Sequence, residues 1–194
     1  ISTALRPTGG SVRVLGHDAV RQPSQVRRAI GFFSASTGLY GRLTPRELLG
    51  YFGDLFAMAR PRLRERIDLL AAAFDLAEFL DRPCDRLSSG MRQRVSIARS
   101  VLHDPPVMIL DEPTAGLDVV TSRHIVAFIR QCRDQGKTVL FSTHIMSEVS
   151  RLCDQVAVVH RGRLAHQGTV AEIRQRFGAD MEQAFLSMIG EEGA

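Results

Sequence analysis

Lysine is almost absent from this sequence of 194 residues. Of its 25 basic residues, 24 are arginines and one, Lys137, is a lysine. Cysteine is also scarce, since the chain holds only Cys84, Cys132 and Cys153, which lie far apart. Three separated cysteines form neither an even disulfide framework nor a CxxC pair, so we expect a reducing, cytosolic setting.

Long apolar runs are missing as well. The longest covers six residues, at positions 69–74, and others such as 107–110 are shorter, so none is long enough for a membrane-spanning helix. Arg6, Pro7 and Gly9 interrupt the first ten residues, so we expect no secretory signal peptide there. With 44% hydrophobic and 24% charged residues, the composition is that of a globular protein with a buried core.

Basic charge is not concentrated anywhere in the chain. The formal net charge is +4, and the arginines are scattered with no block of five. A basic excess can indicate a nucleic-acid or anionic-lipid partner. This scattered distribution favours an ordinary solvated surface, and we expect no nucleic-acid partner.

The second half of the chain alternates strands with helices. Apolar runs at 107–110 and 138–142 predict buried strands, and helical patterns follow at 119–134 and 147–151. A hairpin is expected within 155–166. Such alternation is typical of an α/β fold with a parallel sheet.

The first half is predicted to differ from this pattern. Residues 1–5 are interpreted as the end of a helix, 11–15 as a short strand and 28–33 as another apolar run. A loop with two glycines follows.

An all-helical segment is predicted from Thr44 onward. Thr44 can cap a helix in which Pro45 takes the first position and Glu47 lies three residues after the cap. Two further helical stretches are expected at 61–74 and 77–81. The aromatic residues of this segment are interpreted as core.

Ser88, Ser89 and Gly90 form a small polar turn at the start of a predicted helix. Small residues let a phosphate approach the backbone, and the free N–H groups and positive end of the helix then face the anion. Arg92 and Arg94 are expected to keep this region basic. The alternative is an ordinary serine-capped helix.

An acid pair follows the first of the two buried strands. Asp111 and Glu112 come directly after 107–110, at the carboxyl edge where open α/β sheets bind ligands. Asp111 could hold Mg²⁺ directly or through water. Glu112 could orient and polarise a water against a γ-phosphate. The alternative, a plain acidic turn, is disfavoured by the sequence of four apolar residues followed by Asp-Glu-Pro-Thr.

His144 ends the motif Phe-Ser-Thr-His after the next strand. A histidine at this edge could hydrogen-bond a terminal phosphate and respond to its loss. A single histidine is more often structural, but its place one strand after the acid pair favours the functional interpretation.

These three motifs, in this order, resemble the nucleotide-binding domain of ATP-binding cassette (ABC) transporters. The matching positions are 87–90 for the family signature, 110–112 for the end of Walker B, 115–118 for the D-loop and His144 for the switch histidine. The similarity covers nearly the whole chain. Stretches at 38–40, 43–47 and 163–169 further resemble bacterial exporters of the sodium-efflux and drug-resistance type.

The resemblance implies a P-loop NTPase core with a helical insert, and ATP hydrolysis that drives an export pump. In such pumps two nucleotide-binding domains close head to tail on ATP and Mg²⁺ at the cytoplasmic face of the cell membrane, and separate permease chains span it. The implied roles are Asp111 for Mg²⁺, Glu112 as base, His144 at the γ-phosphate, Ser88, Ser89 and Gly90 on the partner's nucleotide, and Asp118 as a bridge across the dimer.

The resemblance also divides the chain into parts. These are 1–43, the remainder of the N-terminal core with a degenerate Q-loop; 44–86, the helical subdomain; 87–169, the signature helix and the α/β core; and 170–194, a helical tail with a polar end.

One motif of the family is missing from the chain. The family holds ATP phosphates with GxxxxGK[ST]. The lone lysine lies in Gly136-Lys137-Thr138, where Gln131 replaces the first glycine and a strand follows instead of a helix. We therefore expect the P-loop, the first core strand and the adenine-stacking aromatic to lie upstream of Ile1, and the chain alone to be inactive.

Two other motifs depart from the family pattern. The Q-loop glutamine should fall near position 35, where Ala35 lies between Ser34 and Ser36. Either serine could replace it. The signature has Ser89 and Met91 in place of its usual glycine and glutamine, while its serine and second glycine are kept.

Two other functions stay open. One is a soluble cassette ATPase that acts on nucleic acid or the ribosome, although such proteins typically carry tandem cassettes or long inserted arms. The other is a non-catalytic fragment that pairs with an intact partner. Glu112 favours a catalytic parent, and the missing P-loop favours an inactive fragment. The transported substrate cannot be inferred, because membrane chains select it.

Overall fold

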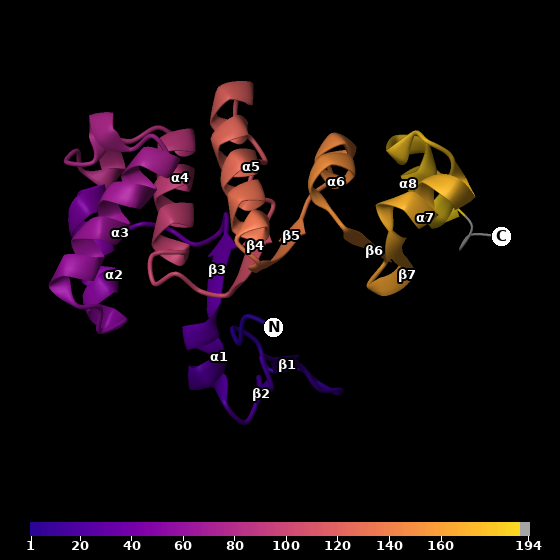
Figure 1. Ribbon diagram of the computed structural model, residues 1–194, viewed down its shortest axis with the longest axis horizontal. Helices are drawn as coiled ribbons and strands as arrows, with labels where there is room; N and C mark the ends of the chain where they lie inside the picture. The colour runs from indigo at the N-terminus through magenta and orange to yellow at the C-terminus, as the bar shows by residue number, and fades with distance from the viewer. Residues whose placement is uncertain (191–194) are drawn as a thin grey trace. The chain divides into compact units, whose positions relative to one another are not determined.

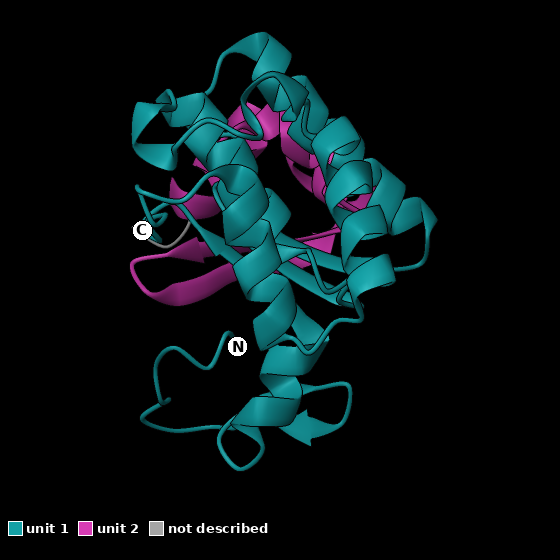
Figure 2. Cartoon of the chain, turned by 90° about the vertical axis from the view of Figure 1, so that its left-hand side faces the viewer, with its two compact units in different colours: residues 1–142 teal, residues 143–194 magenta. Residues whose placement is uncertain are grey.

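The computed structural model describes residues 1–190. The chain forms two compact units, one of residues 1–142 and one that begins at Thr143 (Figure 2). The polar end that was predicted for the tail begins at Gly190, and its residues after Gly190 are outside the described part of the chain. Among the described residues, no helix combines the length and the apolar character needed to cross a bilayer.

A three-stranded parallel sheet organises the first unit. Its strands, in spatial order, are β3 (Ile30–Ser34), β4 (Val107–Asp111) and β5 (Thr138–Ser142) (Figure 1). The register places Ser34, Asp111 and Ser142 opposite one another at the last position of each strand. Strands are present at both predicted places, and their carboxyl ends meet at one edge as parallel pairing requires. The expected burial of 138–142 is wrong, because no residue of β5 is buried and Leu140 is 48% exposed on a face that is covered only in part.

Two helices pack on this sheet, α4 (Ser89–Ser100) on β3 and α5 (Val119–Asp134) on β5. The approach of α4 is very close, because a side chain at Gly31 would meet the carbonyl oxygen of Ser100 at 2.6 Å. Met108 and Leu110 of β4 are 1% exposed on the covered face. These apolar positions explain why the run at 107–110 was recognisable from the sequence.

The start of the chain differs from its prediction. Residues 1–5 form no helix, and Leu5 is 88% exposed, so the expected helix end is wrong. A five-residue helix that does not bury its apolar side chains against the rest of the protein is not stable in water. The segments that follow are a two-residue ribbon, β1 (Arg13–Val14) and β2 (His17–Asp18), and the helix α1 (Pro23–Ala29).

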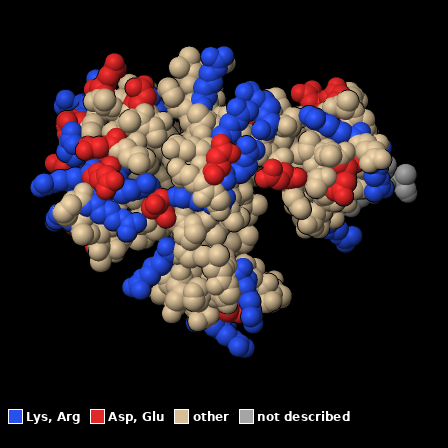
Figure 3. Space-filling view, viewed as in Figure 1, with Lys and Arg blue, Asp and Glu red and all other residues tan. Residues whose placement is uncertain are grey.

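The helical segment is confirmed, but only some of its aromatic residues are core: Phe74 and Phe79 are buried, whereas Tyr51 is 45% exposed. It consists of α2 (Pro45–Leu55), α3 (Arg60–Ala73) and the single 3₁₀ turns η1 (Ala77–Phe79) and η2 (Cys84–Arg86). The predicted capping box is present, since the Thr44 hydroxyl accepts from the Glu47 N–H at 3.2 Å and the Glu47 carboxylate accepts from the Thr44 N–H at 2.8 Å. The stretch expected at 77–81 makes only a 3₁₀ turn. In this segment, the face shown in Figure 3 has acidic and basic side chains interspersed.

The second unit contains the predicted hairpin and tail. Its elements are α6 (Met146–Leu152), β6 (Gln155–His160), β7 (Arg163–Thr169), α7 (Val170–Phe177) and α8 (Met181–Gly190). The tail is two helices because Gly178, with a φ of +104°, ends α7. Val158, Ile173 and Met188 belong to a buried apolar cluster of this unit.

All three cysteines are free thiols. Cys84 and Cys132 are buried, and burial raises the pKa of Cys132 and of Cys153 to about 11. These thiols therefore stay protonated and unreactive at neutral pH.

Candidate functional site

The edge of the sheet holds a row of three polar side chains. The Ser142 hydroxyl donates to Oδ1 of Asp111 at 2.7 Å, and the Ser34 hydroxyl donates to Oδ2 at 3.3 Å. The Ser36 oxygen lies 3.0 Å from that of Ser34. The exposed carboxylate of Asp111 is thus held on both sides by neutral hydroxyls from the flanking strands, which leaves its charge available to a ligand.

Glu112, the next residue, has an unusual backbone conformation. Its φ is +46°, in the left-handed region that costs a non-glycine residue on the order of 1–3 kcal/mol. Its N–H donates to the Ser142 hydroxyl oxygen at 2.9 Å. Six other non-glycine residues of the described chain also have a positive φ, and each such conformation persists only where its surroundings hold it.

The loop after Glu112 is tied to α4. The side-chain amide of Gln93 donates to the carbonyl oxygen of Pro113 at 2.7 Å. A side chain at Gly90 would meet Leu117 at 3.4 Å, so the first turn of α4 lies against this loop. Gln93 lies between Arg92 and Arg94 in the sequence, but nothing in that spacing predicted the contact with Pro113.

The turn that opens α4 is exposed and neutral. Ser88 and Ser89 are accessible, and the Ser88 oxygen caps the helix by accepting from the Met91 N–H at 3.2 Å. The first turn of α4 contains no acidic residue. Ser88 is therefore the helix cap considered from the sequence, and its hydroxyl proton is still able to donate to an anion.

The two arginines of this helix have different surroundings. Arg94 is buried, and one of its nitrogens donates to the carbonyl oxygens of Phe74 at 3.0 Å and Asp75 at 2.9 Å. The expectation that Arg94 supplies charge to the phosphate end of α4 is therefore wrong, because its charge is used to hold the helical segment. Arg92 is exposed and donates to the Leu87 carbonyl oxygen.

Asp118 caps α5. Its carboxylate accepts from the N–H groups of Val120 and Thr121, each at 2.9 Å, and from the Thr121 hydroxyl at 2.7 Å. The bonds from the Thr121 N–H and hydroxyl are the main reasons why the pKa of Asp118 is lowered. The side chain thus has a local role in addition to the one implied by the resemblance.

His144 belongs to the second unit, whereas the other predicted site residues belong to the first. The loop around it is fixed by a buried carboxylate, since the Thr143 hydroxyl donates to Glu148 at 2.9 Å and accepts from the Ile145 N–H at 3.0 Å. Sequence reasoning missed Glu148 as the anchor of this loop, although it lies in the stretch that carries the resemblance.

A complete metal site is not present among residues 1–190, where no three or more His, Cys, Asp and Glu residues are grouped closely enough to hold an ion. Mg²⁺ commonly uses one or two carboxylates together with substrate phosphates and water. Asp111 fits that mode, because it offers hard oxygen donors at an exposed edge.

Comparison with known proteins agrees with this geometry. Residues 1–115 match the ABC transporter family. The chain is 39% identical to the ABC transporter ATP-binding protein NatA of Bacillus subtilis over 97% of its own length and 78% of NatA. It is 37% identical, over its whole length, to the daunorubicin resistance ATP-binding protein DrrA3 of Streptomyces coeruleorubidus, of which it spans 61%.

A solved structure also matches. It is a dimeric ATP-binding cassette in a post-hydrolysis state bound to ADP and Pi, with a TM-score of 0.78 and 25% identity. The alignment covers 88% of this chain and 77% of that one. The fold and the family resemblance predicted from the motifs are confirmed, and the chain belongs to the ABC transporter family as part of its ATP-binding, P-loop NTPase domain.

Proposed function

We propose that this chain is part of the ATP-binding subunit of an exporter, in which ATP hydrolysis drives transport across a membrane. The observation that carries the proposal is the sheet edge, where Asp111 is held by two hydroxyls and is followed by the strained Glu112. The named relative DrrA3 confers daunorubicin resistance, which favours an exporter over a cassette that acts on nucleic acid.

Each acid has a distinct role in this proposal. Asp111 holds Mg²⁺, which neutralises charge on the phosphates when it is bound. Glu112 accepts a proton from the attacking water, and His144 contacts the γ-phosphate. Most of the rate enhancement comes from positioning and electrostatics, as in other phosphoryl transfers.

The turn at the start of α4 is proposed to act on the nucleotide of a second subunit. Ser88 and Ser89 are exposed, Gly90 is partly exposed, and the helix N-terminus that they form has no acidic residue. These features favour an anion. Asp118 would bridge the two subunits from the neighbouring loop. The solved relative captured with ADP and Pi is a dimer, which supports this arrangement.

A hollow on the first unit suits a separate permease chain. It has a volume of about 490 Å³ and is lined in part by Leu39, Tyr40 and Phe52. Aromatic residues are enriched where proteins meet. We infer that a permease segment docks here and holds the subunit at the cytoplasmic face of the membrane.

One face of the sheet is covered only in part: Ile30, Val107 and Ile109 pack there in a cluster with Val14 and Val26, whereas side chains further along the strands are exposed. Phe32 is 38% and Leu140 48% exposed, and alternation along the strands places both on the face to which Asp111 also points. We propose that the segment carrying the P-loop covers this face and completes the ATP site. The 194-residue chain should accordingly bind a fluorescent ATP analogue poorly in Mg²⁺, and micromolar affinity with turnover would contradict this.

Replacement of the proposed base tests the function in the ATP-binding subunit that carries this chain. Glu112→Gln keeps the size of the side chain and removes its basicity, so we expect turnover to fall about 10²–10⁴-fold while ATP binding persists. Glu78→Gln makes the same chemical change at an exposed position of the helical segment and is the matched control. We expect its turnover to stay within about twofold, because substitutions at exposed positions usually have small effects. A loss of less than about threefold for Glu112→Gln would show that Glu112 is not the base.

A further inference from the structure

The hydroxyl of Ser142 occupies a special place beside the acid pair. It donates its single proton to Oδ1 of Asp111 at 2.7 Å and accepts the Glu112 N–H at 2.9 Å. One oxygen atom therefore joins the side chain of the first acid to the backbone of the second. No apolar side chain at position 142 could make either bond.

The position of this hydroxyl is fixed by the sheet. Ser142 is the last residue of β5 and pairs directly with Asp111, the last residue of β4. In-register neighbours on parallel strands point to the same face. Ser142 is exposed, so its contribution at this position comes from its two hydrogen bonds and not from packing.

The backbone of Glu112 gives the second bond its importance. A residue with a φ of +46° is held there by its surroundings. The bond from its N–H to Ser142 is one such restraint, and it sets the direction in which the Glu112 side chain leaves the loop. Without that bond, the loop is free to relax toward an ordinary conformation.

Ser34 completes the arrangement from the opposite strand. Its hydroxyl donates to Oδ2 of Asp111 at 3.3 Å, so the Ser36 hydroxyl is left as the donor in the 3.0 Å contact between the two serines. A carboxylate has about four acceptor positions. With two of them filled by hydroxyls, Asp111 is oriented but keeps lone pairs for a hydrated cation.

We infer that Ser142 is a positioning residue that holds Asp111 and Glu112 in register for metal binding and water activation. The inference rests on the proposed roles of these two acids. Residues that orient a metal ligand typically contribute 10–100-fold to metal affinity or activity. Ser142 acts through both acids at once, so its loss should affect both properties.

A matched pair of variants tests the inference in the ATP-binding subunit that carries this chain. Ser142→Val and Ser142→Thr have the same shape and suit a strand, but only threonine keeps the hydroxyl. For Ser142→Val we expect kcat to fall about tenfold and the Mg²⁺ concentration for half-maximal turnover to rise about tenfold, with KM for ATP within twofold. Ser142→Thr should stay within about threefold of the parent in both.

A second measurement needs no turnover. NMR hydrogen exchange of the Glu112 amide in the 194-residue chain should speed up about tenfold in Ser142→Val and not in Ser142→Thr, because only valine removes its acceptor. If Ser142→Val does not fold, Ser142→Ala takes its place in both measurements.

The outcomes are distinct. Equal kcat and Mg²⁺ dependence in the valine and threonine variants would overturn the inference, as would faster exchange in Ser142→Val with unchanged turnover. If Glu112→Gln keeps full turnover, the proposed base is wrong, and the Mg²⁺ dependence of Ser142→Val then decides whether Asp111 is positioned by Ser142.

Discussion

Charged side chains at the edge of the sheet and charged side chains beneath the helical segment are held in opposite ways. Asp111 is exposed and accepts bonds from neutral serine hydroxyls. Arg94 and Arg99 are buried and donate to backbone carbonyls, and each guanidinium also lies about 5 Å from a phenylalanine ring. The first arrangement keeps charge available for a ligand, whereas the second uses charge to fix packing.

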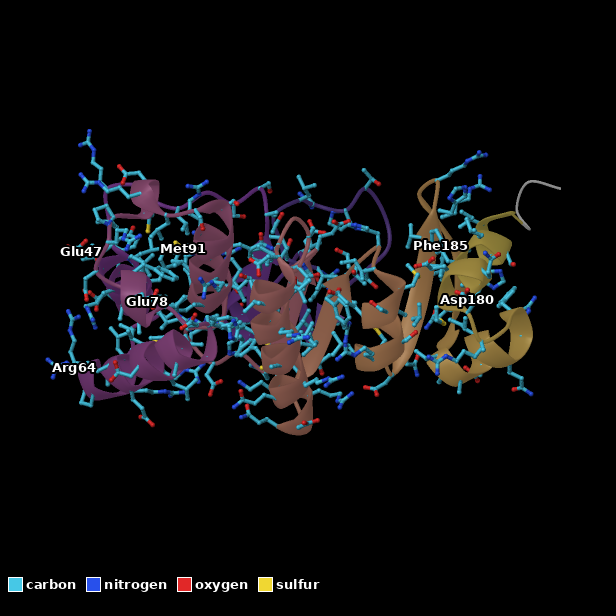
Figure 4. The ribbon with its side chains drawn as sticks, turned by 90° about the horizontal axis from the view of Figure 1, so that it is seen from above. Glu47, Arg64, Glu78, Met91, Asp180 and Phe185 are labelled. Atoms are coloured by element: carbon cyan, nitrogen blue, oxygen red, sulfur yellow. The ribbon has the colours of Figure 1, made fainter. Side chains whose placement is uncertain are left out.

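Burial marks the difference between arginines on neighbouring helices. Arg64 extends from α3 away from the other helices (Figure 4). Burial lowers the pKa of Arg99, which donates to the Gly38 carbonyl oxygen at 3.1 Å. Substitutions at the edge should therefore change activity more than stability, and substitutions at the buried arginines should do the reverse.

The largest expected effect is at the edge. Asp111→Asn keeps an acceptor oxygen for Ser142 and removes the charge, so in the ATP-binding subunit we expect Mg²⁺-dependent turnover to fall about 10³-fold, equivalent to about 4 kcal/mol. The free energy of unfolding should change by less than about 0.5 kcal/mol. Asp134→Asn, at an exposed site, is the control for turnover. A large loss of stability in Asp111→Asn would break the comparison.

The next effect concerns the buried arginine. Arg94→Leu leaves the carbonyl oxygens of Phe74 and Asp75 without their donor, so we expect a loss of about 2–3 kcal/mol in urea unfolding. Arg92→Leu, two residues earlier and exposed, should cost less than about 1 kcal/mol. Equal losses in the two variants would show that burial does not separate them.

A pH effect should follow from His103. Its ring stacks on Phe56 at 3.9 Å and bonds the Ile30 carbonyl oxygen at 3.1 Å, and burial lowers its pKa to about 4. Because the unfolded chain binds a proton near pH 6.5 and the folded chain does not, stability falls as the pH drops from 6.5 to 4. We expect a loss of roughly 1–2 kcal/mol, reduced by the partial exposure of the ring.

His103→Gln provides the control for this pH dependence. The glutamine amide can still donate to the Ile30 carbonyl oxygen and does not titrate. The free energy of unfolding measured with urea should therefore change less between pH 7 and pH 4.5 in the variant than in the parent. An unchanged difference would assign the acid sensitivity to other groups.

The smallest effect compares two helix caps. Ser88→Ala should cost α4 about 1 kcal/mol, because one N–H loses its acceptor. Asp118→Ala removes the acceptor of two N–H groups of α5 and of the Thr121 hydroxyl. The melting temperature of this variant should therefore be lower than that of Ser88→Ala. A larger fall in Ser88→Ala would mean that the neutral cap contributes more stability than the charged one.

Much of the fold was predictable because local patterns determined it. The helix at 119–134 and the strand at 138–142 have the predicted bounds, and the capping box at Thr44 was visible in its spacing. Residues 1–5 were misjudged because a helical pattern of that length depends on tertiary contacts. The roles of the acids, the polar turn and His144 stay predictions.

The contacts that hold the site were harder to predict. The burial of Arg94 depends on the fold of the helical segment, 20 residues away in sequence. The row formed by Ser34, Asp111 and Ser142 depends on the register of three strands, which short apolar runs do not specify. The strained φ of Glu112 likewise has no counterpart in the sequence pattern.

The single lysine has a practical consequence. Lys137 is largely buried and ion-paired with Asp104, between α5 and β5. A protease that cleaves only after lysine has one site in the chain, so a single cut would separate β5 and everything after it from the rest. When opening and closing are fast relative to cleavage, the rate of that cut reports the fraction of molecules in which this junction is open.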